Sequence, residues 1–151
     1  MDVYGYTNNE LTKNVTSNML KEGIEGIMLY QDRESKMFYQ VVDQGNRAGN
    51  YLETSGSLMV AYACMKGARL GVLDKKYHNI GQEIFDGVIK KYLSEKDGRL
   101  NLGGICIMAG LGPENKPNRD GSFEYYISEK IVENDAKGVG PLIMAYIETL
   151  R

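Results

Sequence analysis

The sequence predicts an all-α fold of stacked helical hairpins, with short β-hairpin excursions between the helices. Apolar residues recur at spacings of three and four in four long segments. Polar, glycine-rich turns separate these segments. A unit of outer helix, turn excursion and inner helix also recurs, with Ile27-x-x-Tyr30 matched 62 residues later by Ile89-x-x-Tyr92. Such hairpins stack because one pair cannot cover its own apolar face.

The first two helices differ in character. Residues 9–30 carry one apolar stripe and predict a helix, which is followed by a polar turn and a short β-type run at 37–42. Residues 52–70 predict the second helix. Its middle, Leu58–Met65, is apolar on every side, so we expect this helix to be buried on most sides.

A third helix is predicted at 75–93, with Asp74 as its cap. It is amphipathic, so we expect it on the outside with one wet face. A fourth helix is predicted from a cap at Asn134 or Asp135 as far as Leu150.

Residues 94–133 form a long, glycine-rich irregular stretch between the third and fourth helices. Residues 97–102 predict a turn and a short strand, and residues 123–127 predict a further strand. A segment of this length inside a compact domain is usually functional or disordered.

The composition is that of an ordinary globular protein. A length of 151 residues suits one domain, so we expect a single domain over 1–151. Eighteen basic and 20 acidic residues give a net charge of −2. Such a chain has no global basic field to hold nucleic acid or anionic lipid, and we expect neither as a partner.

No targeting or membrane segment is predicted. Residues 1–6 lack a basic region followed by an apolar one. The longest apolar run, Leu58–Met65, is far shorter than the ~20 residues that a membrane span requires. We therefore expect a cytoplasmic protein that does not enter the membrane.

The two cysteines and the single histidine give no metal site. Cys64 and Cys106 are 42 positions apart, which favours two reduced, buried thiols over a disulfide. His78 has no cysteine near it and lies among polar residues, so a helix-surface position is favoured over a catalytic role.

The lengths of the links predict where function lies. The link at 71–74 is very short, whereas the links before the second and fourth helices are long. All elaborate loops therefore lie at the end where these buried helices begin, and helix N-termini favour anions. Several polar residues are expected to meet on that face: Glu53, Thr54, Ser55, Asn134 and Asp135.

Each candidate motif on this face has two interpretations. Residues 53–57 could cap the helix through Thr or Ser, or could bind an acidic sugar. Tyr125 and Tyr126 could form a sugar-stacking wall or pack in a strand. Loop polarity explains the polar residues of the first excursion as well as sugar binding does; these are Gln40, Asp43 and Gln44.

A pair of carboxylates could serve glycoside hydrolysis. Spacing singles out no pair among the four candidates, which are Glu53, Asp120, Glu124 and Asp135.

Two stretches of the chain resemble the unsaturated uronyl hydrolases of glycoside hydrolase families 88 and 105, and family 105 more closely. The first stretch contains Phe38-Tyr39-Gln40-Val41-Val42-Asp43, Asn50-Tyr51-Leu52-Glu53-Thr54-Ser55-Gly56-Ser57, Ala61-Tyr62-Ala63, Lys66-Gly67 and Gly71-Val72-Leu73-Asp74. The second contains Gly121-Ser122-Phe123-Glu124-Tyr125-Tyr126-Ile127-Ser128 and Glu133-Asn134-Asp135-Ala136-Lys137-Gly138-Val139-Gly140-Pro141.

The resemblance implies a partial α/α toroid of the (α/α)6-barrel type, here about two of its six helical hairpins. It also implies removal of a 4,5-unsaturated uronic acid from pectin-derived oligosaccharides, by enzymes of the unsaturated rhamnogalacturonyl or glucuronyl hydrolase type. In this family an aspartic acid starts hydration of the vinyl-ether double bond. The resemblance implies no metal and no organic cofactor.

The chain resembles only the C-terminal portion of family members, which are more than twice as long. The family's catalytic aspartate, with the histidines and tryptophans of its pocket, lies in the N-terminal portion. No catalytic residue carries over, and we expect the chain to be inactive alone. By resemblance, four residues match positions near the pocket mouth and are predicted to bind substrate: Gln40, Glu53, Ser55 and Tyr126. The alternative is a non-catalytic helical-hairpin module that binds acidic sugars or serves as an oligomerisation scaffold.

Two hairpins leave apolar flanks that a closed barrel would cover. Met19, Met28, Leu142 and Ile143 are therefore expected to be exposed. Large exposed apolar patches mark association. We expect a homo-oligomer, or association with a missing N-terminal half.

Overall fold

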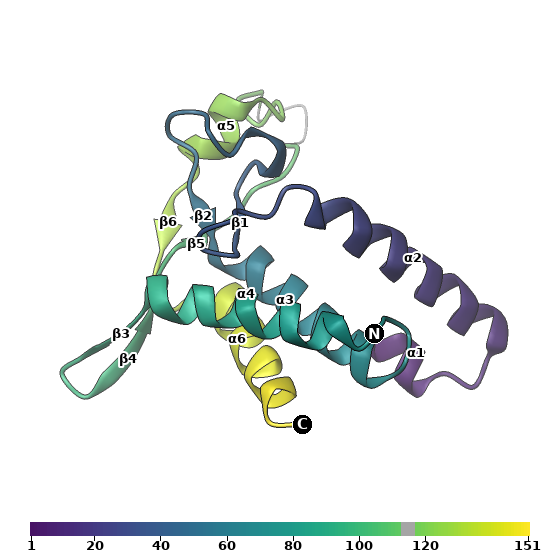
Figure 1. The fold of residues 1–151 in the computed structure, drawn as a ribbon. Helices are drawn as coiled ribbons and strands as arrows, with labels where there is room; N and C mark the ends of the chain where they lie inside the picture. Colours follow the sequence, from purple (N-terminus) through teal and green to yellow (C-terminus); the bar gives the residue numbers. More distant parts are fainter. Residues whose placement is uncertain (113–116) are drawn as a thin grey trace.

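The computed structural model describes residues 1–112 and 117–151, and it is mainly helical (Figure 1). The helices are α1 (Asp2–Tyr6), α2 (Glu10–Met28), the 3-10 turn η1 (Val42–Gln44), α3 (Thr54–Arg69), α4 (Lys76–Tyr92), α5 (Phe123–Ser128) and α6 (Ala136–Thr149). The strands are β1 (Phe38–Tyr39), β2 (Leu52–Glu53), β3 (Leu93–Lys96), β4 (Arg99–Leu102), β5 (Ile105–Cys106) and β6 (Ile131–Val132). The strands form antiparallel pairs, β1 with β2, β3 with β4 and β5 with β6. The helical fold with short β-hairpin excursions is confirmed.

Helix α3 is the centre of the fold. Helices α4 and α6 both pack against it, and it buries Leu58, Ala61, Cys64 and Met65 completely. Burying a side chain of the size of Leu58 stabilises the fold by ~1.5–3 kcal/mol. The expectation that the apolar second helix is buried on most sides is confirmed, as is the presence of two free, buried cysteines.

The short link between α3 and α4 forms as predicted. Gly71 has a positive φ of 71°, which favours glycine, and the backbone N–H groups of Val72 and Leu73 both donate to the Gly67 carbonyl. The Asp74 carboxylate accepts a hydrogen bond from the Lys76 N–H at 2.9 Å, so it satisfies one free donor of the first turn of α4.

The N-terminal part departs slightly from expectation. Helix α2 is shorter at both ends than the predicted 9–30 and begins after Asn9, whose side chain accepts from the Thr12 N–H. The short helix α1 was not predicted. Of the predicted β-type run at 37–42, only Phe38 and Tyr39 form a strand.

The strand predicted at 123–127 is wrong, because these residues form α5. The Ser122 hydroxyl caps the helix by accepting the Tyr125 N–H at 3.1 Å. This local cap outweighs the β-propensity of the aromatic residues, and β5 pairs with β6 instead. The turn predicted at 97–98 is confirmed, since Asp97 and Gly98 have positive φ angles and join β3 to β4. Residues 113–116 of the predicted irregular stretch lie outside the described residues.

Two of the four side chains expected to be exposed are instead partly buried. Met28 and Leu142 are partly buried, because these side chains of α2 and α6 pack against the main core, which includes residues of α3. Met19 and Ile143 are 67% and 54% exposed, as expected. No helix in the described residues is long and apolar enough to cross a membrane.

Candidate functional site

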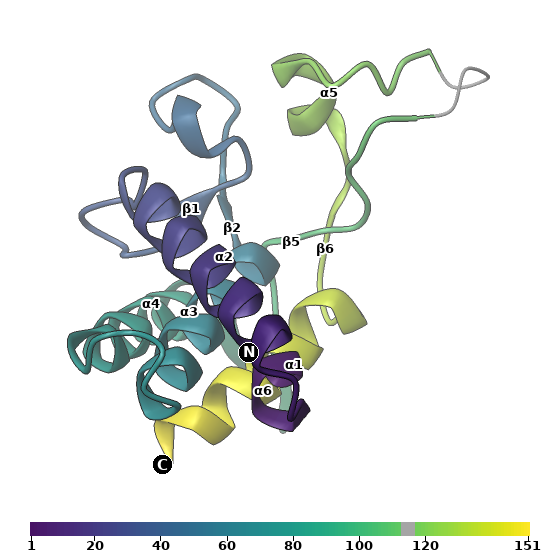
Figure 2. The ribbon, with the colours of Figure 1, turned by 90° about the vertical axis from the view of Figure 1, so that its right-hand side faces the viewer.

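The two inner helices, α3 and α6, begin at the same end of the molecule, where the two loop excursions meet (Figure 2). The Thr54 N–H donates to the Gly104 carbonyl at 2.9 Å, and the Asn134 N–H donates to the Leu102 carbonyl at 2.9 Å. Both helix starts are therefore attached to the same segment, 102–106. The predicted meeting of the regions around residues 53 and 134 on one face is confirmed.

Strand alternation places three polar side chains on one face of the β1–β2 pair. Phe38 lies opposite Glu53, and the Gln40 N–H donates to the Tyr51 carbonyl one step further along. Because successive side chains of a strand point to opposite faces, Gln40, Tyr51 and Glu53 share a face. Cys106 of β5 lies against this face, since its N–H donates to Glu53 and its thiol accepts from Gln40.

The Glu53 carboxylate organises the start of α3. It is 6% exposed and accepts hydrogen bonds from the Gly56 N–H at 2.6 Å, the Ser55 hydroxyl at 2.8 Å and the Cys106 N–H at 3.1 Å. A negative charge is favourable at a helix N-terminus. The chain's own carboxylate thus occupies the position that an anionic ligand would take.

The expectation that Thr or Ser caps this helix is wrong, because Glu53 is the cap. The two buried hydroxyls bond elsewhere. Thr54 donates to the Gly103 carbonyl at 2.7 Å, and Ser57 donates to the Glu53 carbonyl at 2.6 Å. The longer side chain of Glu53 folds back over the first turn of α3 and accepts the Gly56 N–H there.

Tyr51 carries an unusual hydroxyl group. Its oxygen is buried and has no hydrogen-bond partner within residues 1–112 and 117–151. Burial raises the pKa of Tyr51, and the neighbouring Cys106 thiol and Glu53 carboxylate act in the same direction. The phenol is therefore neutral, and it presents an unused donor and acceptor beside Gln40.

Tyr92, the last residue of α4, lies next to this cluster. Its hydroxyl donates to the Leu52 carbonyl at 2.9 Å, and burial raises its pKa, with a smaller effect of the Glu53 charge. Gly104 lies against its ring, where a Cβ atom would come within 2.5 Å of Cζ. Only glycine permits this approach together with the φ of 70° found there.

Tyr126 is held apart from the Glu53 cluster, on α5. This helix docks on the loop that follows η1, through an ion pair of Arg47 with Glu124 and through the Arg47 guanidinium, 3.9 Å above the centre of the Phe123 ring. Tyr126 is half-buried, and its ring centre lies 5.1 Å from that of Tyr125. Among the described residues it makes no side-chain hydrogen bond to the cluster.

The structure thus brings together Gln40, Glu53 and Ser55 of the four predicted site residues. Tyr51 and Cys106 were missed. Tyr51 lies two positions before Glu53, so the alternation of side chains along a strand could have placed it on the same face. Cys106 joins the cluster only through the pairing of β5 with β6.

The four carboxylates considered for glycoside chemistry do not form a pair of general acid and base. Hydrogen bonds from Ser122 lower the pKa of Asp120, and hydrogen bonds from Lys137 lower that of Asp135. Glu124 is paired with Arg47, and Glu53 caps α3. A general acid needs a raised pKa, which neither aspartate has. The described residues also contain no group of three or more metal-ligating side chains.

Comparison with known proteins agrees with this architecture. The model of Glycosyl Hydrolase Family 88 matches residues 7–151. Protein Atu3128 of Agrobacterium fabrum is 41% identical over 132 residues, as is a 24.9 kDa protein in the picA locus of Rhizobium radiobacter. The match takes in 84% of this chain and 56% of each relative, so the chain spans about half the length of these curated relatives.

A solved structure of a family 105 glycoside hydrolase from C. acetobutylicum is 47% identical, with a TM-score of 0.84. The match covers 89% of this chain and 37% of that one. A possible family 105 member from Salmonella enterica has a TM-score of 0.77 over 99% of this chain and 35% of its own. It is only 17% identical and supports the fold alone. By the family match over nearly its whole length, the chain belongs to glycoside hydrolase family 88.

Proposed function

We propose that residues 1–151 form one domain, the C-terminal part of an α/α-barrel hydrolase. This hydrolase acts on 4,5-unsaturated uronic acid ends of pectin-derived oligosaccharides. The proposal rests chiefly on one observation, the polar cluster of Gln40, Tyr51 and Glu53 at the start of an inner helix. This cluster lies inside the segment that matches family 88 and at the end where both loop excursions meet. Loops on a rigid scaffold are where binding residues usually lie.

The cluster has groups suited to sugar hydroxyls. The Gln40 amide, the Ser55 hydroxyl and the unpartnered Tyr51 hydroxyl would hydrogen-bond to the saccharide. Glu53 would act as a positioning residue, because its carboxylate is already engaged by three donors. Tyr126 would offer an aromatic face to a sugar ring.

The uronate carboxylate would not bind at the start of α3. Glu53 supplies a negative charge there, and two like charges a few ångströms apart repel each other. The groups that recognise the uronate would therefore lie away from the start of α3. The catalytic aspartate implied by the resemblance lies in the N-terminal portion of family members, so we propose that the chain alone is inactive.

An absorbance assay tests inactivity. The chain is incubated with an unsaturated rhamnogalacturonan disaccharide, and the band of the double bond is followed. We expect no loss of absorbance, because the catalytic aspartate that the resemblance implies lies outside residues 1–151. Robust turnover would refute the proposal that the chain alone is inactive.

Calorimetry tests saccharide binding. We expect heat with the unsaturated uronide and a weaker affinity for Gln40→Ala, since the variant lacks the amide. The matched control is Gln82→Ala, whose amide donates to Asp86 on the same helix α4 within the described part of the chain. Equal loss in both variants, or none in Gln40→Ala, would contradict the assignment.

The second candidate is a non-catalytic helical scaffold. The exposed apolar side chains of α6 favour it, because surfaces of this kind mark association. A scaffold would give no heat with either an unsaturated or a saturated uronide. Its self-association would appear as a multiple of the chain mass in light scattering.

A further inference from the structure

We propose that Cys106 is a positioning residue of the candidate saccharide site. Its thiol holds the side-chain amide of Gln40, so that the amide carbonyl is presented to a neutral sugar hydroxyl. The inference rests on the proposed function and deepens it, because it names the group that orients Gln40 and the kind of ligand group that Gln40 receives.

The backbone on both sides of Cys106 fixes the position of its thiol. Cys106 pairs with Ile131 where β5 meets β6, and the next N–H, that of Ile107, donates to the Lys130 carbonyl at 2.9 Å. The Cys106 N–H itself donates to the Glu53 carboxylate at 3.1 Å, and this carboxylate is held by two further donors at the start of α3. The thiol is thus attached to a segment that both β6 and α3 hold in place.

This thiol binds the side chain of Gln40. The Gln40 Nε2 atom donates to Sγ of Cys106 at 3.5 Å, and Cys106 is only 8% exposed. A thiol is a weak acceptor, but a hydrogen bond shielded from water is stronger than one in solvent. A free glutamine side chain samples several rotamers, and a ligand would have to remove that freedom on binding. The contact with Cys106 removes part of it beforehand.

The contact leaves the acceptor end of the Gln40 amide free. A glutamine amide donates through its nitrogen and accepts through its oxygen, and the two atoms lie on opposite sides of the planar group. Because the nitrogen faces Cys106, the carbonyl oxygen faces away from it. This oxygen accepts no hydrogen bond from the described residues. A hydroxyl is the donor that would satisfy it.

The neighbouring side chains favour a neutral ligand group. Glu53 places a negative charge on the same face, and a second carboxylate would be repelled there. The Tyr51 hydroxyl oxygen is buried without a partner in residues 1–112 and 117–151, and it offers a further donor and acceptor. A sugar hydroxyl both donates and accepts, so it matches the Gln40 carbonyl and the Tyr51 hydroxyl.

The other cysteine shows what a purely structural thiol looks like in this fold. Cys64 is completely buried and packs with Ile24 and Leu73, and its thiol makes no hydrogen bond to the described residues. Cys106 instead contacts the polar side chains of Gln40 and Glu53. Its surroundings are those of a group that orients a neighbour.

Nuclear magnetic resonance of the ligand-free chain tests the positioning directly. The side-chain amide signal of Gln40 is assigned by its absence from Gln40→Ala. We expect this signal to move to the position of a freely hydrated amide in Cys106→Ala, which lacks the acceptor. It should stay displaced in Cys106→Ser, whose hydroxyl also accepts. Urea unfolding checks that each variant is folded.

Calorimetry with the unsaturated rhamnogalacturonan disaccharide tests the consequence for binding. Cys106→Ala should weaken the affinity by about 3- to 10-fold in the parent protein, but by less than about 2-fold when Gln40 is already alanine. The two substitutions are coupled in this way only if Cys106 acts through Gln40. Cys106→Ser should bind within about 2-fold of the parent.

The control is Cys64→Ala, which also removes a buried thiol and should change neither the Gln40 signal nor the affinity. An unchanged Gln40 signal in Cys106→Ala would overturn the proposal, as would an equal loss of affinity with and without the Gln40 amide. A parent protein that gives no heat would contradict the proposed function and, with it, the saccharide role of Gln40. The amide signal would still report whether Cys106 orients that side chain, so the two failures are distinguishable.

Discussion

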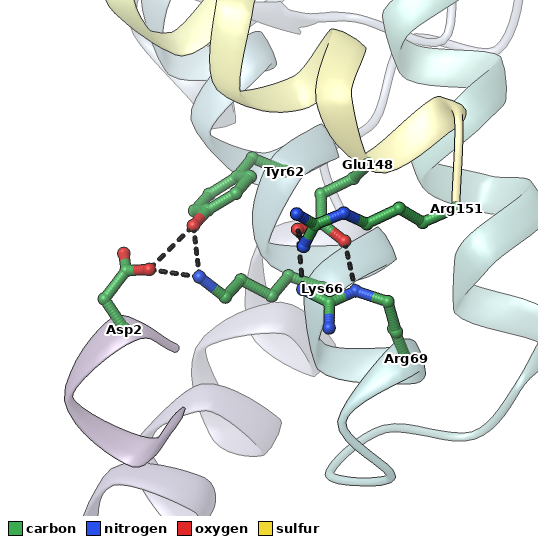
Figure 3. Close-up of polar contacts among 6 residues, drawn as sticks. All are labelled: Asp2, Tyr62, Lys66, Arg69, Glu148 and Arg151. Atoms are coloured by element: carbon green, nitrogen blue, oxygen red, sulfur yellow. Dashed lines mark hydrogen bonds and ion pairs between the residues drawn. The ribbon is translucent and has the colours of Figure 1, made fainter. Parts of the chain in front are cut away.

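Arg69 and Glu148 form a bidentate ion pair that joins the last turns of the inner helices α3 and α6 (Figure 3). The Arg69 Nε and Nη2 atoms donate to the two carboxylate oxygens of Glu148 at 2.6 and 2.8 Å. Glu148 is 3% exposed, and Arg151 lies 3.7 Å from it. Helices α3 and α6 are thus joined at both ends, by the segment 102–106 where they begin and by this pair where they end.

A second polar group lies beside this pair. Lys66 of α3 is ion-paired with Asp2, and the Tyr62 hydroxyl donates to the same carboxylate at 2.8 Å (Figure 3). These contacts attach α1 to the final turns of α3, at the end of the molecule away from the candidate site.

Replacing Glu148 by Gln should destabilise the protein. The variant leaves Arg69 without its buried counter-ion, and breaking a buried pair costs up to ~3–5 kcal/mol. Arg69 is 31% exposed and keeps part of its hydration. We therefore expect a loss of about 1–3 kcal/mol in the free energy of unfolding, measured in urea.

The matched control for that variant is Glu124→Gln. It removes the same charge from the pair with Arg47, in which Glu124 is 68% exposed. Exposed pairs contribute ~0–1 kcal/mol, so this variant should unfold almost like the parent protein. Equal losses in the two variants would refute the special role of Glu148.

The same pair predicts how stability depends on pH. Hydrogen bonds from Arg69 lower the pKa of Glu148 in the folded state, against the effect of burial. Unfolding at acidic pH therefore takes up a proton, so the contribution of Glu148 is present above its unfolded pKa and is lost as the pH falls through the folded value.

Thermal unfolding at a series of pH values measures this contribution. The difference in stability between the parent and Glu148→Gln should be constant near neutral pH. It should shrink below about pH 4.3, the ordinary pKa of glutamate, as the parent carboxylate becomes protonated. A difference that is unchanged at acidic pH would contradict the ion-pair explanation.

Tyr51→Phe should separate stability from binding. The Tyr51 hydroxyl is buried without a partner, so its removal should leave the free energy of unfolding unchanged or raise it by up to ~1 kcal/mol. Affinity for the uronide should fall in calorimetry if this hydroxyl meets a sugar.

Tyr92→Phe is the contrasting variant. It removes the hydrogen bond to the Leu52 carbonyl and should cost ~0.5–1.5 kcal/mol of stability. A Tyr51→Phe protein as destabilised as Tyr92→Phe would indicate that the Tyr51 hydroxyl has a structural partner after all.

The sequence predicted the parts of this fold that depend on neighbouring residues. Apolar periodicity located α3, α4 and α6 to within two residues, and Asp135 caps α6 as expected. The polar run around Glu53 pointed to the start of an inner helix. These features follow from contacts within one or two helical turns.

Two features were harder to predict, one set by distant contacts and one by competing local preferences. Cys106 meets Gln40 and Glu53 only because β5 pairs with β6 and lies against the β1–β2 pair. The aromatic residues at 123–127 predict a strand, whereas the structure has helix α5, which the Ser122 cap favours. The position of Cys106 thus depends on pairing between segments far apart in the sequence, whereas α5 depends on which of two local preferences prevails.

Two helical glycines should respond to alanine in opposite ways. A Cβ atom at Gly81 of α4 would lie 2.7 Å from the Ala61 carbonyl oxygen and 2.6 Å from Cγ of Met65, so Gly81→Ala must push α4 away from α3. We expect a loss of about 1–3 kcal/mol. Gly140→Ala meets open space in the chain alone and should stabilise α6 by ~0.5–1 kcal/mol. Urea unfolding of the two variants measures both values, and a destabilising Gly140→Ala in a monomeric chain would show that another part of the protein contacts α6 at Gly140.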